Sequence, residues 1–198
     1  IISLVELIKM SRDEPEGIPH YLDLIRQSAE NASTIVSDIL DFTRNTEIEK
    51  QKVPADHIVQ RVLKDAERLD ANDRVKLETE VSDGVEAYCD FSKMQRVLSN
   101  LVRNSAEAMT KADVKDPRVR IRTEERDGEV HFVVSDNGPG LPEEIRDSLF
   151  VPFVTRGKNT GTGLGLAIVK HFVDAHGGRV DVHTGKNGTT FDIALPKE

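Results

Sequence analysis

Hydrophobic residues follow two different patterns along this chain, and the change falls near residue 50. In the first 45 residues the apolar positions recur at alternating spacings of three and four, which is typical of helices that pack along a heptad seam. The clearest run predicts a helix over residues 20–44, with seam positions Leu22, Ile25, Ala29, Ala32, Val36, Ile39 and Thr43. An apolar segment at residues 1–10 predicts the end of an earlier helix, and a loop rich in charge, proline and glycine joins the two.

Two striped helices joined by a short loop predict an antiparallel helical hairpin over residues 1–45. One hairpin cannot bury both of its stripes, whereas two hairpins can do so by forming a four-helix bundle. We therefore expect a homodimer through this segment. The alternative is a helix pair that packs within the chain on a second domain.

A polar, highly charged stretch at residues 46–54 is expected to be a linker, and beyond it strand patterns alternate with helices. Helices are predicted at residues 58–69, 91–109 and 163–176, and strands at 75–81, 119–123, 130–135, 180–182 and 191–195. Asp127-Gly128 and Asn187-Gly188 predict two hairpin turns. The expected fold is α+β: the helical hairpin, then an α/β sandwich over residues 55–198 with helices on one face of a mixed sheet.

Composition narrows the possible functions. The 198 residues carry a formal net charge of −8, which argues against a nucleic-acid binder because such domains are usually basic. No apolar run approaches the roughly 18 residues that would suggest a membrane span. The single cysteine, Cys89, can form no internal disulfide, which fits a reducing compartment. The sequence also contains no CxxC, HExxH or P-loop lysine motif.

One predicted helix carries an unusual polar stripe. Asn100, Asn104 and Glu107 are spaced i, i+4 and i+7, so they lie along the flank of its apolar face. Asparagine is a poor residue for a helix interior, so two about one turn apart ask for an explanation. The functional interpretation is that Asn104 offers its amide oxygen to Mg²⁺, a hard cation that prefers oxygen ligands and phosphate partners. The alternative is a solvated helix face.

Asp136 follows the strand predicted at residues 130–135, where a side chain can point from the sheet edge into a cleft. A carboxylate there can accept a hydrogen bond from the exocyclic amino group of adenine. Guanine presents a carbonyl oxygen at the same place, and an unpaired buried acceptor costs about 1–3 kcal/mol, so we expect a preference for ATP over GTP. Gly138 and Gly140 would allow close backbone approach. The alternative is an ordinary Asp-Asn-Gly turn.

A glycine-rich run precedes the last predicted helix. In Gly161-Thr162-Gly163-Leu164-Gly165-Leu166, bare backbone N–H groups could reach phosphate oxygens, and the helix N-terminus favours negative charge. The stretch from residue 141 to 160 is long enough to act as a lid over a ligand. Arg156 and Lys158 within it could meet phosphate charge, or they could be plain surface residues.

These motifs, in this order, resemble the catalytic half of a two-component sensor histidine kinase, within the superfamily that also contains gyrase, Hsp90 and MutL. Residues 100–109 resemble the N box, 136–140 the first G box, 149–153 the F box and 161–166 the second G box. Residues 188–191 resemble the closing strand motif, and residues 37–44 resemble the end of the second dimerisation helix. The resemblance covers nearly the whole chain, and the hairpin favours the kinases within the superfamily.

The resemblance implies binding of ATP with Mg²⁺. It makes Asn104 the metal ligand, places Asn100 beside the phosphates and assigns Asp136 to adenine. The residues implied to shape the pocket and lid are Gly138, Gly140, Gly161, Gly163, Leu164 and Gly165, and Thr190 is expected to approach adenine. Many family members carry a basic residue three positions after the metal-binding asparagine, but here that residue is Glu107, so Arg103, Arg156 or Lys158 would contact phosphate instead.

The phosphoacceptor histidine is the main departure from the family. That histidine lies near the start of the first hairpin helix and precedes an acidic residue, whereas His20 precedes Tyr21 and Leu22. We therefore expect the acceptor upstream of Ile1, and the alternative is a kinase that phosphorylates another chain. The remaining histidines are expected to be structural or surface residues: His57, His131, His171, His176 and His183.

The implied activity is a protein histidine kinase core that passes its phosphate to an aspartate on a response-regulator receiver domain. In the resembling ATPases a glutamate that activates water stands four residues before the metal-binding asparagine, and here that residue is Asn100. We expect slow hydrolysis of ATP and a cytoplasmic location for this portion of the protein. The sequence leaves open whether a membrane anchor lies upstream. Two alternatives are an ATP-binding dimeric scaffold without its own acceptor, and a serine kinase of the anti-sigma type, which lacks the heptad hairpin.

Overall fold

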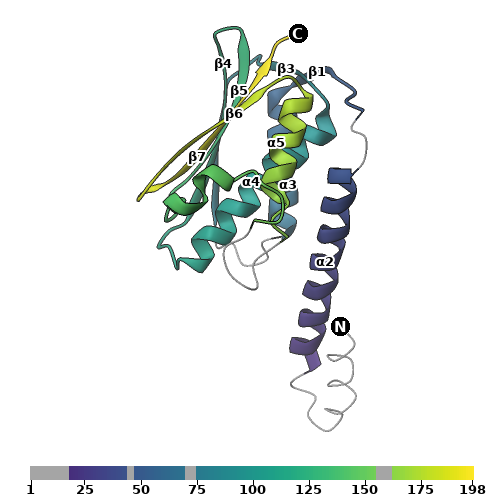
Figure 1. Ribbon diagram of the computed structural model, residues 1–198, viewed down its shortest axis with the longest axis vertical. Coiled ribbons are helices and arrows are strands. Elements are labelled where there is room, and N and C mark those ends of the chain that lie inside the picture. The colour runs from purple at the N-terminus through teal and green to yellow at the C-terminus, as the bar shows by residue number, and fades with distance from the viewer. Residues whose placement is uncertain (1–17, 44–46, 70–74, 155–161) are drawn as a thin grey trace. The chain divides into compact units, whose positions relative to one another are not determined.

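The computed structural model describes residues 18–43, 47–69, 75–154 and 162–198 (Figure 1). It divides the chain into two compact units, Ile1–Arg44 and Asn45–Glu198. Within the described residues the first unit consists of a single helix, and the second unit contains all the strands. The chain therefore changes from helical to mixed structure close to the place where its hydrophobic pattern changes.

The helix of the first unit, α2, runs over Ile18–Thr43 and confirms the long helix that the heptad spacing predicts. The helix predicted at residues 1–10 lies outside the described residues. Along α2 the large apolar side chains Leu22, Val36 and Ile39 are 54%, 57% and 43% exposed. The described part of the chain thus leaves much of the predicted apolar stripe uncovered.

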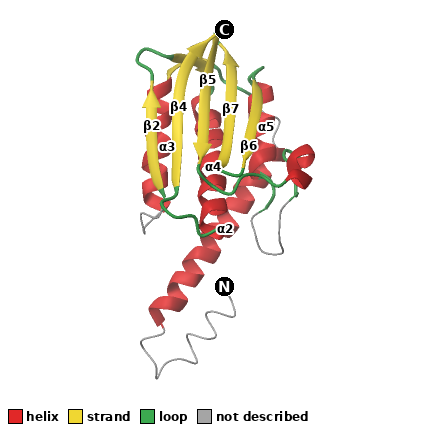
Figure 2. Ribbon diagram, turned by 90° about the vertical axis from the view of Figure 1, so that its left-hand side faces the viewer, coloured by secondary structure: helices red, strands yellow, loops and turns green. Residues whose placement is uncertain are grey.

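The second unit is built on a five-stranded sheet with the strand order β2-β4-β5-β7-β6 (Figure 2). The strands are β2 (Lys76–Val81), β4 (Arg118–Arg126), β5 (Glu129–Asp136), β6 (Arg179–Gly185) and β7 (Gly188–Pro196). β2 is parallel to β4 and the other neighbours are antiparallel, so the sheet is mixed, as predicted. Asp127 and Gly128 both have positive φ at the β4–β5 turn, as a two-residue hairpin turn requires.

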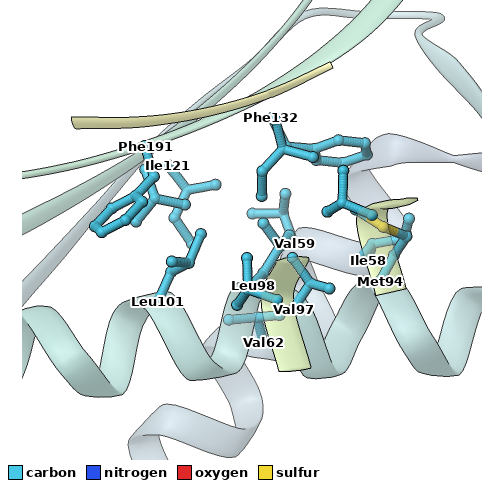
Figure 3. Close-up of a cluster of buried hydrophobic side chains, with 14 of the residues drawn as sticks. Ile58, Val59, Val62, Met94, Val97, Leu98, Leu101, Ile121, Phe132 and Phe191 are labelled. Carbon is cyan, nitrogen blue, oxygen red and sulfur yellow. The ribbon is translucent and has the colours of Figure 1, made fainter. Parts of the chain in front are cut away.

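Three helices cover one face of this sheet: α3 (Ala55–Leu69), α4 (Phe91–Lys111) and α5 (Gly165–Ala175) (Figure 2). Figure 3 shows side chains of α3 and α4, among them Ile58 and Leu101, packed against Phe132 of β5 and Phe191 of β7. This arrangement confirms the predicted α+β sandwich. None of the described helices combines the length and the apolar character that a membrane span requires.

A second, two-stranded sheet was not predicted. β1 (Gln51–Pro54) pairs antiparallel with β3 (Glu86–Cys89), so the last four residues of the predicted linker belong to a strand. Both strands have only four residues, and Pro54 has no N–H to contribute to a ladder, which explains why the alternation pattern missed them. The predicted lid stretch also contains a short 3-10 helix, η2 (Glu143–Ser148).

The single cysteine closes β3 and is fully buried. Burial disfavours the thiolate, and the neighbouring carboxylate of Asp90 disfavours it further, so the pKa of Cys89 is raised to about 12. Cys89 is therefore a protonated thiol inside the core at neutral pH.

We predict that Phe132→Ala lowers the free energy of unfolding by about 3–5 kcal/mol, because it removes a fully buried aromatic ring from between the sheet and the helices. Phe153→Ala is the matched control, since that ring is 69% exposed and should change stability by less than about 0.5 kcal/mol. Urea unfolding followed by circular dichroism measures both. Equal losses in the two variants would contradict this account of the core.

Candidate functional site

The carboxylate of Asp136, the last residue of β5, lies at the centre of the candidate site. Its Oδ1 accepts from the backbone N–H of Gly138 at 2.9 Å and from that of Thr189 at 3.1 Å. Its Oδ2 accepts from the hydroxyl of Ser105 on α4 at 2.9 Å. An ionised carboxylate has about four acceptor positions, so this geometry leaves one position on Oδ2 for a further donor.

The loop after β5 lies close to neighbouring segments, and this is possible because two of its residues are glycines without a Cβ. A Cβ on buried Gly138 would come within 2.9 Å of Oδ1 of Asp136 and within 3.1 Å of Cγ of Met109. Gly140 has φ of +76°, and a Cβ there would overlap the carbonyl oxygen of Gly185 at the end of β6. The predicted roles of these glycines in close approach therefore have a physical basis in the fold.

Asn100 and Arg103 on α4 meet the start of α5. Nδ2 of Asn100 donates to the carbonyl oxygen of Gly165 at 3.3 Å, and its Oδ1 accepts from Nη2 of Arg103 at 2.8 Å. Asn100 is only 1% exposed, so the alternative of a solvated face does not hold at this position. Glu107, in contrast, is exposed and lies 3.7 Å from Nζ of Lys111 on the same helix.

Asn104 lies one turn after Asn100 and is half-buried. No described residue forms a hydrogen bond with its amide. A Cβ on Gly165 would lie 3.7 Å from both Oδ1 and Nδ2 of Asn104, so this amide faces the first residue of α5. Glycine at this position leaves space beside an amide that no described residue binds.

The glycine-rich run leads directly into α5. Gly163 has φ of +67°, and its carbonyl oxygen accepts from the backbone N–H of Phe153 at 3.0 Å. Leu164 is buried in the core, and its N–H donates to the hydroxyl of Thr162 at 3.1 Å. Three residues predicted to contact or surround phosphate lie outside the described residues: Arg156, Lys158 and Gly161.

Thr190 is not brought to the Asp136 carboxylate. Its hydroxyl lies 3.0 Å from that of Ser135, its register partner on β5. Side chains alternate along β7, and Phe191 points into the core, so Thr190 lies on the opposite face of the sheet. Thr189, whose N–H binds Asp136, is the neighbour that shares the Phe191 face, and it is 5% exposed.

Sequence reasoning missed Ser105 and Thr189 as members of the site. The period-two pattern of Phe191, Ile193 and Leu195 extends back to residue 189, so it held the signal for Thr189. Ser105 lies among the apolar residues on the buried face of α4 and is 3% exposed. A buried hydroxyl needs a partner, and this requirement was the available signal that Ser105 contacts a polar group.

The residues brought together fit a nucleotide with its divalent cation. One acceptor position on Asp136, the amide of Asn104 and the N-terminus of α5 are the groups that an adenine, a hard cation and a phosphate would use. Among the described residues no cluster of three or more His, Cys, Asp or Glu could hold a metal by itself. A cation here would therefore take most of its oxygen ligands from phosphate and water.

The chain is similar to known proteins over most of its length. Residues 89–198 match the family model for the histidine kinase-, DNA gyrase B- and HSP90-like ATPases. The chain is 33% identical over 181 residues to the C4-dicarboxylate transport sensor protein DctB of Rhizobium meliloti, and the match covers 89% of this chain and 28% of DctB. It is 25% identical over 201 residues to the sensory histidine kinase/phosphatase NtrB of Vibrio alginolyticus, with 96% of this chain and 56% of NtrB covered.

The solved structure of histidine kinase ThkA in complex with response regulator protein TrrA has the same fold. The TM-score is 0.78 at 25% sequence identity, with 99% of this chain and 56% of that chain covered. The present chain thus spans between 28% and 56% of the length of these relatives.

We predict that Gly140→Ala destabilises the protein more than Gly84→Ala does. Both glycines have nearly the same positive φ, +76° and +75°, so an alanine pays the same left-handed backbone cost of about 1–2 kcal/mol at either position. Only at Gly140 does the added methyl group overlap another atom, the carbonyl oxygen of Gly185. Urea unfolding of the two variants measures the difference, and equal losses would show that the loop has room to move.

Proposed function

Since this chain belongs to the family of histidine kinase-, DNA gyrase B- and HSP90-like ATPases, as a histidine kinase catalytic core homologous to named sensor kinases, we propose that it transfers the γ-phosphate of ATP to a histidine side chain. The observation that carries this proposal is the presence of two ligand-binding groups at one site, the carboxylate of Asp136 and the amide of Asn104. The carboxylate of Asp136 has one acceptor position that no described residue fills. The amide of Asn104, the residue before Ser105, faces the start of α5 and has no hydrogen-bond partner among the described residues.

Asp136 is proposed to bind the exocyclic amino group of adenine through Oδ2. Support comes from the three donors that fix the carboxylate, because a preoriented acceptor loses little freedom when a ligand binds. Guanine would bring a carbonyl oxygen to the same acceptor. The mismatch leaves an acceptor unpaired at a cost of about 1–3 kcal/mol, which favours ATP over GTP.

Asn104 is proposed to be the protein ligand of Mg²⁺, with Asn100 and Arg103 near the phosphates. When bound, the cation would neutralise phosphate charge and hold the phosphates in line for transfer. Arg103 already reaches the amide of Asn100, and Nη2 would lie 3.8 Å from a Cβ on Gly165, so its charge is near the α5 N-terminus. Gly163, Leu164 and Gly165 would shape the backbone that faces the phosphates.

The chemical step would be a direct displacement at phosphorus. A neutral imidazole nitrogen attacks the γ-phosphorus with its lone pair, the bond to the β,γ-bridging oxygen breaks, and ADP leaves with those electrons. This nucleophile needs no strong base, so positioning and charge neutralisation supply most of the catalysis. Asn100, with an amide engaged by Gly165 and Arg103, cannot take a proton from water, so we expect hydrolysis to be slow.

The acceptor histidine is proposed to lie upstream of Ile1, on the predicted first helix of the hairpin. The exposed apolar stripe of α2 supports a homodimer, since Leu22, Val36 and Ile39 need a covering surface. A response-regulator receiver domain is the proposed recipient of the phosphate, in keeping with the complex of ThkA with TrrA. Within the chain, residues 55–198 would form the ATP-binding domain and residues 1–45 the dimerisation segment.

We predict that Asp136→Asn abolishes nucleotide-induced thermal stabilisation while leaving the fold intact. The asparagine oxygen can still accept from Gly138 and Thr189, but its amide nitrogen would then meet the amino group of adenine as a second donor. At a hundredfold excess of Mg·ATP over its dissociation constant, the wild-type protein should gain about 2.7 kcal/mol, and the variant should gain almost none.

Asp181→Asn is the matched control for this experiment, since that side chain is 54% exposed on β6. Differential scanning fluorimetry with Mg·ATP and with Mg·GTP measures all three proteins. An undiminished ATP response in Asp136→Asn would overturn the adenine assignment.

We further predict that the chain, extended upstream to include the whole first helix, becomes phosphorylated by γ-labelled Mg·ATP. The label should be labile to acid and stable to base, as expected for phosphohistidine, and Asn104→Ala should remove it. An acid-stable label would indicate a serine kinase instead. Nucleotide binding with no label at all would indicate a scaffold without its own acceptor, and rapid release of free phosphate would indicate an ATPase.

A further inference from the structure

His176 lies at the end of α5 opposite to the glycine-rich run, and it joins three segments. Its Nε2 accepts from the backbone N–H of Asp90 at 2.9 Å, and its Nδ1 lies 2.7 Å from the carbonyl oxygen of Phe172. Its own carbonyl oxygen accepts from Nζ of Lys50 at 2.8 Å. The imidazole is 1% exposed, so these contacts take the place of water.

The two ring contacts define one protonation state. A carbonyl oxygen can only accept, so Nδ1 carries the proton, and a backbone N–H can only donate, so Nε2 must be bare. A second proton would set an N–H of the ring against the N–H of Asp90. The junction is therefore complete only while His176 is neutral.

Asp90 connects this junction to α4. Its carboxylate is the N-cap of α4: Oδ1 accepts from the backbone N–H of Ser92 at 3.0 Å and from that of Lys93 at 3.2 Å. Its Oδ2 accepts from the backbone N–H of Glu49 at 3.3 Å. The start of α4, the end of α5 and the segment before β1 are thus tied at one place.

α4 and α5 are consequently joined by hydrogen bonds at both ends of their contact. At one end His176 binds Asp90, and at the other Asn100 binds Gly165. α5 has 11 residues and is roughly 16 Å long, so a shift of one residue is about 1.5 Å. A shift of that size along the axis displaces His176 and Gly165 together from their partners on α4, and it also changes the position of Gly165 relative to Asn104.

We propose that neutral His176 is a positioning residue for nucleotide binding, which fixes the register of α5 against α4 and so holds Gly165 beside Asn104. This inference rests on the proposed function, because the register matters for binding only if nucleotide occupies the site near Asn104. His176 touches no part of that site and acts through the two helices.

The charges around the junction agree with a neutral ring. Burial lowers the pKa of His176 below its ordinary value of 6.5, and the ammonium of Lys50 lowers it further, against the opposing effects of the Phe172 carbonyl and the Asp90 carboxylate. Lys93, in the first turn of α4, places its ammonium 5.0 Å from the ring centroid of Phe172, the residue whose carbonyl oxygen contacts Nδ1 of His176. Because the folded pKa is lowered, the junction is complete above pH 6.5 and is lost as the pH falls towards the folded pKa.

The test compares the affinity of the full chain for Mg·ADP between pH 8.0 and pH 5.0 in four proteins: wild type, His176→Gln, His176→Leu and the exposed control His57→Gln. Calorimetry gives the affinities, and circular dichroism confirms folding at each pH. The glutamine oxygen can accept from Asp90 without titrating, so His176→Gln should bind within about twofold of wild type at pH 7.5, whereas His176→Leu, with that N–H unpaired, should bind about tenfold more weakly.

Below pH 6.5 the wild type and His57→Gln should lose affinity relative to His176→Gln. Protonation of the nucleotide phosphates cancels in this ratio. Parallel pH curves for wild type and His176→Gln, with binding intact, would overturn this inference alone. A wild-type protein that does not bind Mg·ADP at pH 7.5 would overturn the proposed function, and this inference would fall with it.

A measurement on the wild type alone guards against variants that do not fold. The ¹⁵N shifts of the His176 ring should show a proton on Nδ1 and none on Nε2 at pH 7.5. Since coupling between two ligands is reciprocal, saturating Mg·ADP should lower the titration midpoint of this ring further. A proton on Nε2, or a midpoint that nucleotide leaves unchanged, would overturn the proposal.

Discussion

The hydrogen bonds to the carboxylate of Asp136 connect the sheet to the helix that covers it. The donors come from α4, from the loop that follows β5 and from the first residues of β7. Each of these groups is buried or half-buried and would need another partner if the carboxylate were removed. The group proposed to read adenine is therefore also a structural part of the unit, and its orientation is fixed by the fold before any ligand binds.

The contact between α4 and α5 beside the site also combines a structural and a proposed functional role. From the sequence, Asn100 could belong to a phosphate site or to a solvated helix face, and in the structure its amide is buried and binds the first carbonyl of α5. An amide at this place holds the two helices together and cannot itself take a proton from water. This agrees with the proposed transfer to an imidazole, because the attacking nitrogen of a neutral imidazole carries no proton that a base must remove.

Patterns in the sequence predicted the elements that have strong local signals. The heptad seam located α2, and the Asp127-Gly128 turn located the β4–β5 hairpin, because both signals depend on residues close together in the chain. β1 and β3 escaped because each is four residues long and pairs with a partner more than thirty residues away. At the site, Asn104 and Asp136 could be predicted from their motifs. The choice between Thr189 and Thr190 depends on strand register. The partner of Ser105 depends on the packing of α4 against β5.

Cys89 gives this fold a built-in reporter. It is the only thiol in the chain, it pairs with Gln51 in the register of β1 and β3, and it immediately precedes the residue that caps α4. A thiol reagent cannot reach it while the small sheet is closed, and the raised pKa keeps it unreactive. The rate at which a thiol reagent alkylates Cys89 in the native protein would therefore measure how often the small β1–β3 sheet opens. No label would have to be introduced for this measurement.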